Sequence, residues 1–176
     1  MQFRTRGTPE QIPPNHPRPD AALSPAMTVV ASGARRRALR DGDRHVDTAH
    51  LLHSLVESDT AVREVFDGAP QLARVLGYLV QRSIGYGLRW QAAREDSGAV
   101  PVVREPGGEG WSPPAAAALD RAARRGQAHA GGLDLLAALL ADPRCRAVEV
   151  LERAGVVVAR LAARTEDRLV AGEPPR

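Results

Sequence analysis

The sequence contains no lysine, so all 24 residues counted as lysine or arginine are arginine. A lysine amine is the working group of P-loop nucleotide hydrolysis, of Schiff-base catalysis and of lysine general bases. None of these chemistries is open to this chain, and a Gly-x-x-x-x-Gly-Lys-Ser/Thr motif is impossible. We therefore expect no ATP turnover of the P-loop kind.

Cysteine is also scarce: Cys145 stands alone, so no internal disulfide can form. A single thiol is typical of a reducing compartment, and the cytoplasm is the expected location. No apolar run approaches the ~20 residues of a membrane span, and the first residues lack the apolar region of a signal peptide. We expect no membrane partner.

Aromatic residues make up only 3% of the chain, whereas apolar residues together make up 43%. Alanine, leucine and valine supply most of the apolar side chains. This composition favours helices packed through small side chains over sheets, which prefer β-branched and aromatic residues. The net charge of +3 is too small to demand a nucleic-acid partner.

Proline and glycine divide the chain into two helical blocks. Residues 1–22 contain five prolines and are expected to be a disordered tail. Residues 85–110 have the glycine and proline content of a linker, and 171–176 form a second tail. The first block is then 23–84 and the second block is 111–170.

The two blocks have the pattern of a tandem repeat. Each opens with a serine followed by proline, at Ser24 and Ser112, which is a favourable N-cap and first helical residue. Gly42 and Gly126 fall where these first helices are expected to end. The leucines of the next helix have identical spacing in both blocks: Leu51, Leu52 and Leu55 against Leu135, Leu136 and Leu139.

Two more helices are predicted in each block. The third helix of the first block carries Val62, Val65 and Phe66, matched by Val148, Val150 and Leu151. The fourth shows helical periodicity at Leu72, Val75, Leu76, Leu79 and Val80, and its counterpart runs from 156 to 169. The expected fold is all-α, a tandem pseudo-repeat of two four-helix units with about eight helices.

The first block carries Ser24, two alanines four apart, and then the run Val-Asp-Thr-Ala-His-Leu-Leu at 46–52. This arrangement resembles the Clp N-terminal domain, the tandem repeat that precedes the AAA+ modules of the ClpA, ClpB and ClpC unfoldases. The family pattern there is a Thr or Ser opening, two Ala four apart, then Ile-Gly-Thr-Glu-His-Leu-Leu. In the second block Ser112 and its alanines fit the first helix, and 131–136 stand in place of the Thr-Glu-His-Leu-Leu stretch.

The resemblance implies a protein that recruits substrates and adaptors for an unfoldase. In some ClpC proteins each repeat also binds phosphorylated arginine through the glutamate of the Thr-Glu-His stretch and the opening hydroxyl. Ala49 and Leu133 stand here in place of those glutamates, so we expect no phospho-arginine recognition of that form. The binding residues carried over from the family are Ser24, Thr48, Ala49, His50, Ser112, Leu133 and Asp134.

Three histidines, His45, His50 and His53, are the one cluster that raises the question of zinc. There is no His-Glu-x-x-His motif, so we expect a structural histidine at 50, no metal and no cofactor. Ser24 and Ser54 lack the Gly-x-Ser-x-Gly elbow of a hydrolase. Cys145 lies at a predicted helix start, and we interpret it as a small apolar residue that packs in the core. We expect no enzyme.

Arginines concentrate in and just after the first helix of the first block and in the matching helix of the second, and nucleic-acid binding is the alternative they raise. No aromatic residues are interleaved for base stacking, so a solvated helix face is favoured and a nucleic-acid partner is not expected. These arginines are Arg35, Arg36, Arg37, Arg40 and Arg44, with Arg121, Arg124 and Arg125 in the second block.

The sequence therefore predicts a non-catalytic module that binds proteins or peptides and is related to Clp proteolysis. It is an adaptor, a decoy, or a protein that sequesters peptides or peptide-like ligands. The expected partners are a Clp-type ATPase, its substrates or its adaptors. A small basic DNA-binding regulator is the alternative.

Overall fold

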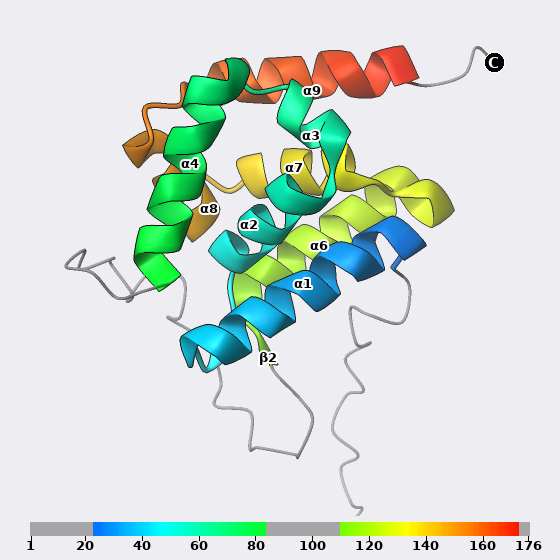
Figure 1. The fold of residues 1–176 in the computed structure, drawn as a ribbon. Helices are drawn as coiled ribbons and strands as arrows, with labels where there is room; N and C mark the ends of the chain where they lie inside the picture. Colours follow the sequence, from blue (N-terminus) through cyan, green and yellow to red (C-terminus); the bar gives the residue numbers. More distant parts are fainter. Residues whose placement is uncertain (1–22, 84–109, 173–176) are drawn as a thin grey trace, which may run out of the picture.

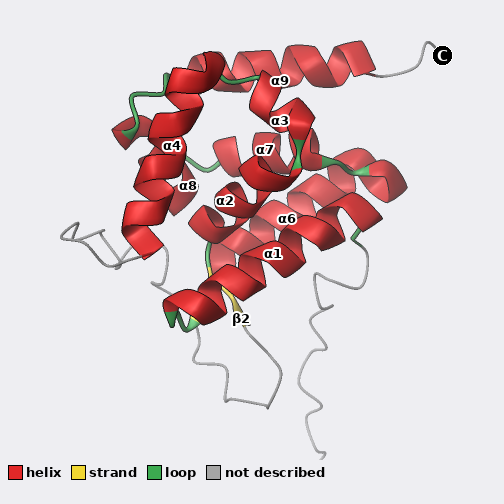
Figure 2. Ribbon diagram, in the orientation of Figure 1, coloured by secondary structure: helices red, strands yellow, loops and turns green. Residues whose placement is uncertain are grey.

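The fold was analysed in a computed structural model that describes residues 23–83 and 110–172 (Figure 1). The predicted all-α class is confirmed: eight α-helices make up nearly all of the described residues, as Figure 2 shows. They are α1 (Pro25–Asp41), α2 (Thr48–Ser58), α3 (Thr60–Glu64), α4 (Gly68–Ser83), α6 (Pro113–Gly126), α7 (Gly132–Leu140), α8 (Arg146–Arg153) and α9 (Val158–Gly172). The predicted 1–22 tail lies outside the described residues, as does most of the predicted linker.

The first helix of each block begins as predicted. The Ser24 side chain accepts a hydrogen bond from the Met27 amide at 3.2 Å, and the Ser112 side chain accepts one from the Ala115 amide at 3.4 Å. In both helices a proline occupies the first position, where its missing N–H costs nothing.

The ends of these two helices differ. Gly42 caps α1 in the left-handed conformation, with φ of 73°, as predicted. Gly126 is the last residue of α6, but its φ of −92° is ordinary, and the positive φ of 49° belongs to Gln127. Glycine is needed at 126 for space instead: a Cβ there would lie 2.8 Å from both Ala130 Cβ and Asp134 Oδ2.

Two details of the predicted third and fourth helices are wrong. Helix α3 ends at Glu64, so Val65 and Phe66 lie in the turn that follows, although both are buried. On α4 the buried face holds Val75 and Leu79, while Val80 is 47% exposed. Helix α4 lies along one side of the molecule (Figure 1). Neighbouring helices bury only the part of its surface that carries Val75 and Leu79.

One hydrophobic core extends through both blocks. Helix α2 lies at its centre and packs against α1, α3, α4, α6, α7 and α8. The matched leucines of α2 and α7, from Leu51 to Leu139, are buried as the spacing predicts. Both blocks follow the same order of helices, but their interpretation as two copies of one unit stays a prediction.

Reciprocal hydrogen bonds join the blocks at their helix starts. Ser24 Oγ donates to the Ala130 carbonyl oxygen, just before α7, and the Ser112 amide donates to the Val46 carbonyl oxygen at 2.9 Å, just before α2. Next to the second bond, β1 (His45–Val46) pairs in parallel with β2 (Gly110–Trp111), so Gly110 belongs to a strand and not to the linker. Each first helix thus begins against the other block.

At the carboxyl end, α9 continues to Gly172, two residues beyond the predicted end of the second block. Among the helices of the described ranges, none has the length and apolar character that crossing a membrane requires.

Candidate functional site

The most polar buried site of the first block forms at the start of α2. Asp47 is the N-cap: its Oδ1 accepts hydrogen bonds from the amides of Ala49 and His50, both at 3.0 Å. In return the Asp47 amide lies 3.1 Å from His50 Nδ1, which completes a capping box. Thr48, the first residue of α2, accepts from the Ala147 amide at 3.0 Å and so connects α2 to α8.

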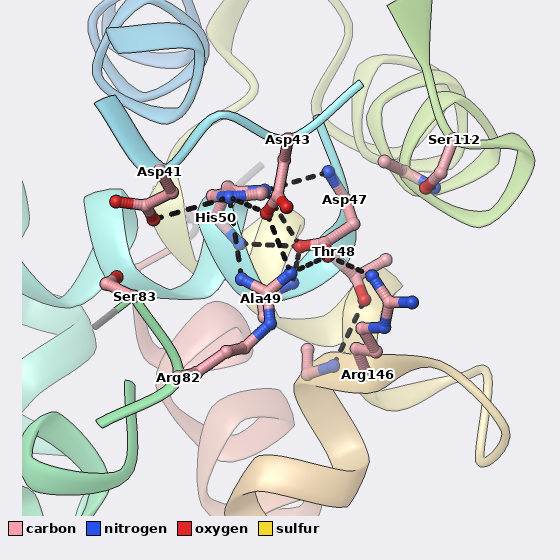
Figure 3. Close-up of polar contacts among 12 residues, drawn as sticks. Asp41, Asp43, Asp47, Thr48, Ala49, His50, Arg82, Ser83, Ser112 and Arg146 are labelled. Atoms are coloured by element: carbon pink, nitrogen blue, oxygen red, sulfur yellow. Dashed lines mark hydrogen bonds and ion pairs between the residues drawn. The ribbon is translucent and has the colours of Figure 1, made fainter. Parts of the chain in front are cut away.

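Charged side chains from four parts of the chain surround this helix start, as Figure 3 shows. Arg146 of α8 donates from Nη1 to Asp47 Oδ2 at 2.5 Å, and Arg82 of α4 pairs with the same carboxylate. Arg82 also reaches Asp43 Oδ2 at 3.3 Å. We call this set the α2 cluster; its members are Asp41, Asp43, Asp47, His50, Arg82 and Arg146.

The α2 cluster perturbs the acidity of its members. Burial alone would raise the pKa of Asp47, but the hydrogen bond with His50 and the charges of Arg82 and Arg146 hold it well below its usual range. Burial would lower the pKa of His50, but its hydrogen bonds to Asp43 and Asp47 raise it to about 9. The Asp47 carboxylate is therefore ionised and fully paired inside the protein.

The imidazole of His50 faces carboxylates on both sides. Its Nε2 lies 3.1 Å from Asp43 Oδ2 and 3.7 Å from Asp41 Oδ2, while its Nδ1 lies 2.9 Å from Asp47 Oδ1. The ring itself is 2% exposed. Sequence reasoning missed Asp41 and Asp43, because no motif in the sequence groups them with His50.

The structure does not bring the three histidines of the sequence analysis together into a metal-ligand group within the ranges 23–83 and 110–172. His45 is in β1, and His53 Nε2 lies 3.2 Å from Glu57 Oε1 on the next turn of α2. Burial and the charge of Arg37 lower the pKa of His53 to about 4. Only His50 belongs to a group with metal-binding geometry, and its neighbours there are aspartates.

Most of the binding residues carried over from the Clp family are buried and so inaccessible to a ligand. Ser24, Thr48, Ala49, His50 and Ser112 are buried, and Leu133 is only partly exposed. Asp134 accepts from the Gly131 amide at 2.8 Å and so caps α7. Ser24 lies beside the start of α7, and Ser112 lies beside the start of α2. The serine that begins each block is therefore next to the family-matched segment of the other block.

A more accessible site lies where α9 begins. Here a hollow of about 230 Å³ opens between the turn after α3, the first half of α4 and the start of α9. We call it the α9 hollow. Its lining residues are Val65, Asp67, Gln71, Arg74, Gly155, Val156, Val157, Arg160, Leu161 and Arg164.

The α9 hollow has a mainly polar, basic lining with a few apolar residues beneath it. Val65, Val156 and Leu161 are buried beneath it. Three arginines and one aspartate line it, which leaves an excess of two positive charges (three minus one). Arg74 Nε donates to the Ala154 carbonyl at 3.1 Å, while Arg164 and Arg160 lie 3.3 Å and 4.0 Å from the Asp67 carboxylate, so all three arginines have partners.

The sequence analysis missed the α9 hollow. Its arginines are spread over 90 positions and belong to both blocks, so no local pattern groups them. No protein-family model matches this chain, and a search of curated proteins finds no match.

Proposed function

We propose that this chain is a non-catalytic module that binds protein or peptide segments, of the kind found at the N-termini of Clp unfoldases. The observation that carries the proposal is the α9 hollow, where buried valines and a leucine lie beneath arginines that are 40–65% exposed at Arg164 and Arg160. The lining is mainly polar and basic, and polar, solvent-accessible groups of this kind form the rim of protein-recognition sites.

The size of the hollow indicates a segment of a polypeptide as the ligand. A volume of about 230 Å³ is below the roughly 300–1,000 Å³ of pockets that enclose a whole small molecule. It accommodates one or two side chains. The arginines favour a carboxylate next to an apolar side chain, because guanidinium groups bind carboxylates in a planar, bidentate manner.

The surroundings of the candidate nucleophiles support a non-catalytic role. The Ser24 hydroxyl donates to the Ala130 carbonyl while its oxygen caps α1. The Cys145 thiol is buried, with its sulfur 3.5 Å from the Leu139 carbonyl oxygen. Both side chains have structural uses that account for them.

In this proposal the partners are a Clp-type ATPase, its substrates or adaptors, or peptide-like ligands, and the cytoplasm is where they meet. The roles of adaptor, decoy and sequestering protein share the same binding step. They differ in whether the bound segment is passed on to the ATPase.

The binding step is tested by fluorescence anisotropy with labelled peptides. One peptide places aspartate and glutamate beside leucine, and its partner replaces the acids with lysine. We expect the acidic peptide to bind and Arg160→Glu to abolish that binding. Arg124→Glu is the matched control, because Arg124 on α6 is 68% exposed against 65% for Arg160 and lies outside the α9 hollow. Equal loss in both variants, or equal binding of both peptides, would refute the site.

DNA binding remains the alternative from another class, and the first helix offers part of a basic face. Arg36 and Arg40 are exposed on α1, but Arg37 pairs with Glu57 and Arg35 lies 4.8 Å from the centre of the Trp111 ring. A mobility-shift titration in increasing salt separates the two functions. Binding that weakens steeply with salt and survives Arg160→Glu would favour DNA.

A further inference from the structure

The end of α1 places two carboxylates beside His50. Asp41 is the last residue of the helix, and Gly42 reverses the chain with its left-handed φ of 73°. The Asp43 amide then donates to the Ala38 carbonyl at 3.0 Å, which holds Asp43 over the helix end. The C-terminus of a 17-residue helix carries a partial negative charge, so this is a location that favours a cation.

One nitrogen and two oxygens converge there. His50 Nε2 and one carboxylate oxygen each from Asp41 and Asp43 all lie within 4.8 Å of one another. The two distances to His50 Nε2 are 3.1 Å from Asp43 and 3.7 Å from Asp41. Zinc bonds of 2.0–2.2 Å in tetrahedral geometry put neighbouring ligand atoms about 3.4 Å apart, so the observed distances lie on either side of the required one.

Asp41 provides an independent indication of a missing partner. Its side chain is only 6% exposed, and its Oδ2, the oxygen that faces His50, is buried without a hydrogen-bond partner in the part of the chain that the structure describes. Arg40 approaches only the other oxygen, at 3.6 Å. A buried carboxylate oxygen without a donor is unfavourable, and a bound cation would satisfy it.

The opposite edge of the His50 ring has the support that a metal-binding histidine requires. Nδ1 lies 2.9 Å from Asp47 Oδ1, and Asp47 is in turn fixed by Arg146. For zinc to bind, Nε2 must lose its proton while Nδ1 keeps its own and donates it to Asp47 Oδ1, the arrangement that histidine ligands regularly use. In that state Nδ1 no longer accepts from the Asp47 amide, which lies 3.1 Å away. The ring is therefore oriented with Nε2 toward Asp41 and Asp43.

We propose that Asp41, Asp43 and His50 form a binding site for a divalent transition-metal ion, with zinc as the preferred ion and water completing the coordination. An imidazole together with carboxylates selects zinc over calcium and magnesium, which prefer oxygen ligands alone. The sequence analysis expected no metal because it considered three histidines and not this mixed set.

Arg82 is the competitor for this site. Its Nη1 lies 3.4 Å from His50 Nε2 and its Nη2 lies 3.3 Å from Asp43 Oδ2, so the guanidinium occupies the position of a cation. When zinc binds, Arg82 has to leave His50 and Asp43, but it can keep its contact with Asp47. The site is thus filled either by the arginine or by the metal.

The test is a zinc titration of the full chain by calorimetry, with cobalt(II) absorption as a second readout of coordination. Asp43→Asn and Asp41→Asn are each expected to weaken binding by ~10-fold or more. Arg82→Gln is expected to tighten it. Asp120→Asn on α6 is the matched control, since its side chain is 53% exposed against 43% for Asp43.

Circular dichroism of each variant separates loss of binding from loss of folding. A folded Asp43→Asn protein that keeps its zinc affinity would overturn the proposal, as would an intact chain that shows neither heat of zinc binding nor cobalt absorption at millimolar metal. The peptide-binding proposal does not depend on this result, because none of the three metal ligands lines the α9 hollow.

Discussion

Arg146, the first residue of α8, donates a hydrogen bond of 2.5 Å to Asp47, the N-cap of α2, across 99 positions of the sequence. Both side chains are at most 10% exposed. The same carboxylate also receives two amides of α2 and pairs with Arg82. One aspartate therefore connects α2, α4 and α8.

Asp47→Ala is expected to lower the free energy of unfolding by about 3–5 kcal/mol, because it leaves buried arginine charge without its carboxylate and removes the cap of α2. Urea denaturation measures the change. Asp67→Ala is the control, since Asp67 is 55% exposed and loss of a surface ion pair costs up to about 1 kcal/mol. A small effect at Asp47 would show that the ion pairs of the α2 cluster contribute little.

Leu52→Ala is expected to destabilise the protein by about 2–5 kcal/mol, the range for a large-to-small change in a packed core. Leu52 is fully buried on α2. Leu39 on α1 is 64% exposed, so Leu39→Ala should change stability by no more than about 0.5 kcal/mol. Thermal or urea melting that fails to separate the two variants would contradict the packing of α2.

Replacing Gly132 of α7 by alanine tests how closely this helix approaches the first block, and Gly77 of α4 provides the comparison. A Cβ at Gly132 would lie 2.1 Å from Asp59 Oδ2 and 3.0 Å from Leu55 Cδ1, so Gly132→Ala should cost about 1–3 kcal/mol. A Cβ at Gly77, inside α4, would meet nothing within 4 Å, so Gly77→Ala should stabilise by up to about 1 kcal/mol. Denaturant midpoints that move in the same direction would contradict this prediction.

Acidification should destabilise the protein through His53. Burial and Arg37 lower its pKa in the folded state to about 4, against 6.5 for the free side chain, with Glu57 and Asp41 opposing and Arg40 assisting. The unfolded chain thus binds this proton more readily, and stability is lost as pH falls from 6.5 towards 4. Urea midpoints over this range should fall less in His53→Gln than in the parent protein, and His129→Gln, an exposed control, should follow the parent.

Free phospho-arginine is expected not to bind. The Ser24 hydroxyl is engaged with Ala130, and Ala49 is fully buried. The nearest carboxylates are also in use, since Asp47 pairs with two arginines and Asp134 caps α7. Calorimetric titration is the direct measurement, and micromolar affinity would mean that one of these carboxylates exchanges its partner for the ligand.

Local signals predicted the local structure well. The Ser24 and Ser112 caps, the left-handed Gly42 and the buried leucines of α2 and α7 follow from spacing and capping chemistry alone. The errors arise where tertiary contacts decide. The space at Gly126 is set by Ala130 and Asp134, four and eight residues further on, and depends on how the chain turns from α6 into α7.

The candidate sites could be predicted only in part. His50 and Asp47 were visible as residues of a helix start, but their partners Arg82 and Arg146 lie 35 and 99 positions from Asp47. The α9 hollow joins side chains of α4 and α9 in the same way. These groups of side chains form only when the helices pack together, so no short pattern in a single sequence indicates them.

The reciprocal anchoring of the first helices couples the stability of the two blocks. Helix α1 begins against the Ala130 carbonyl and α6 against the Val46 carbonyl, and both starts rest on one shared core. If either half opened, the other would lose an anchor and expose its apolar face to water. We therefore expect the two halves to unfold together, and a fragment containing one half would lose the carbonyl that anchors the start of its first helix.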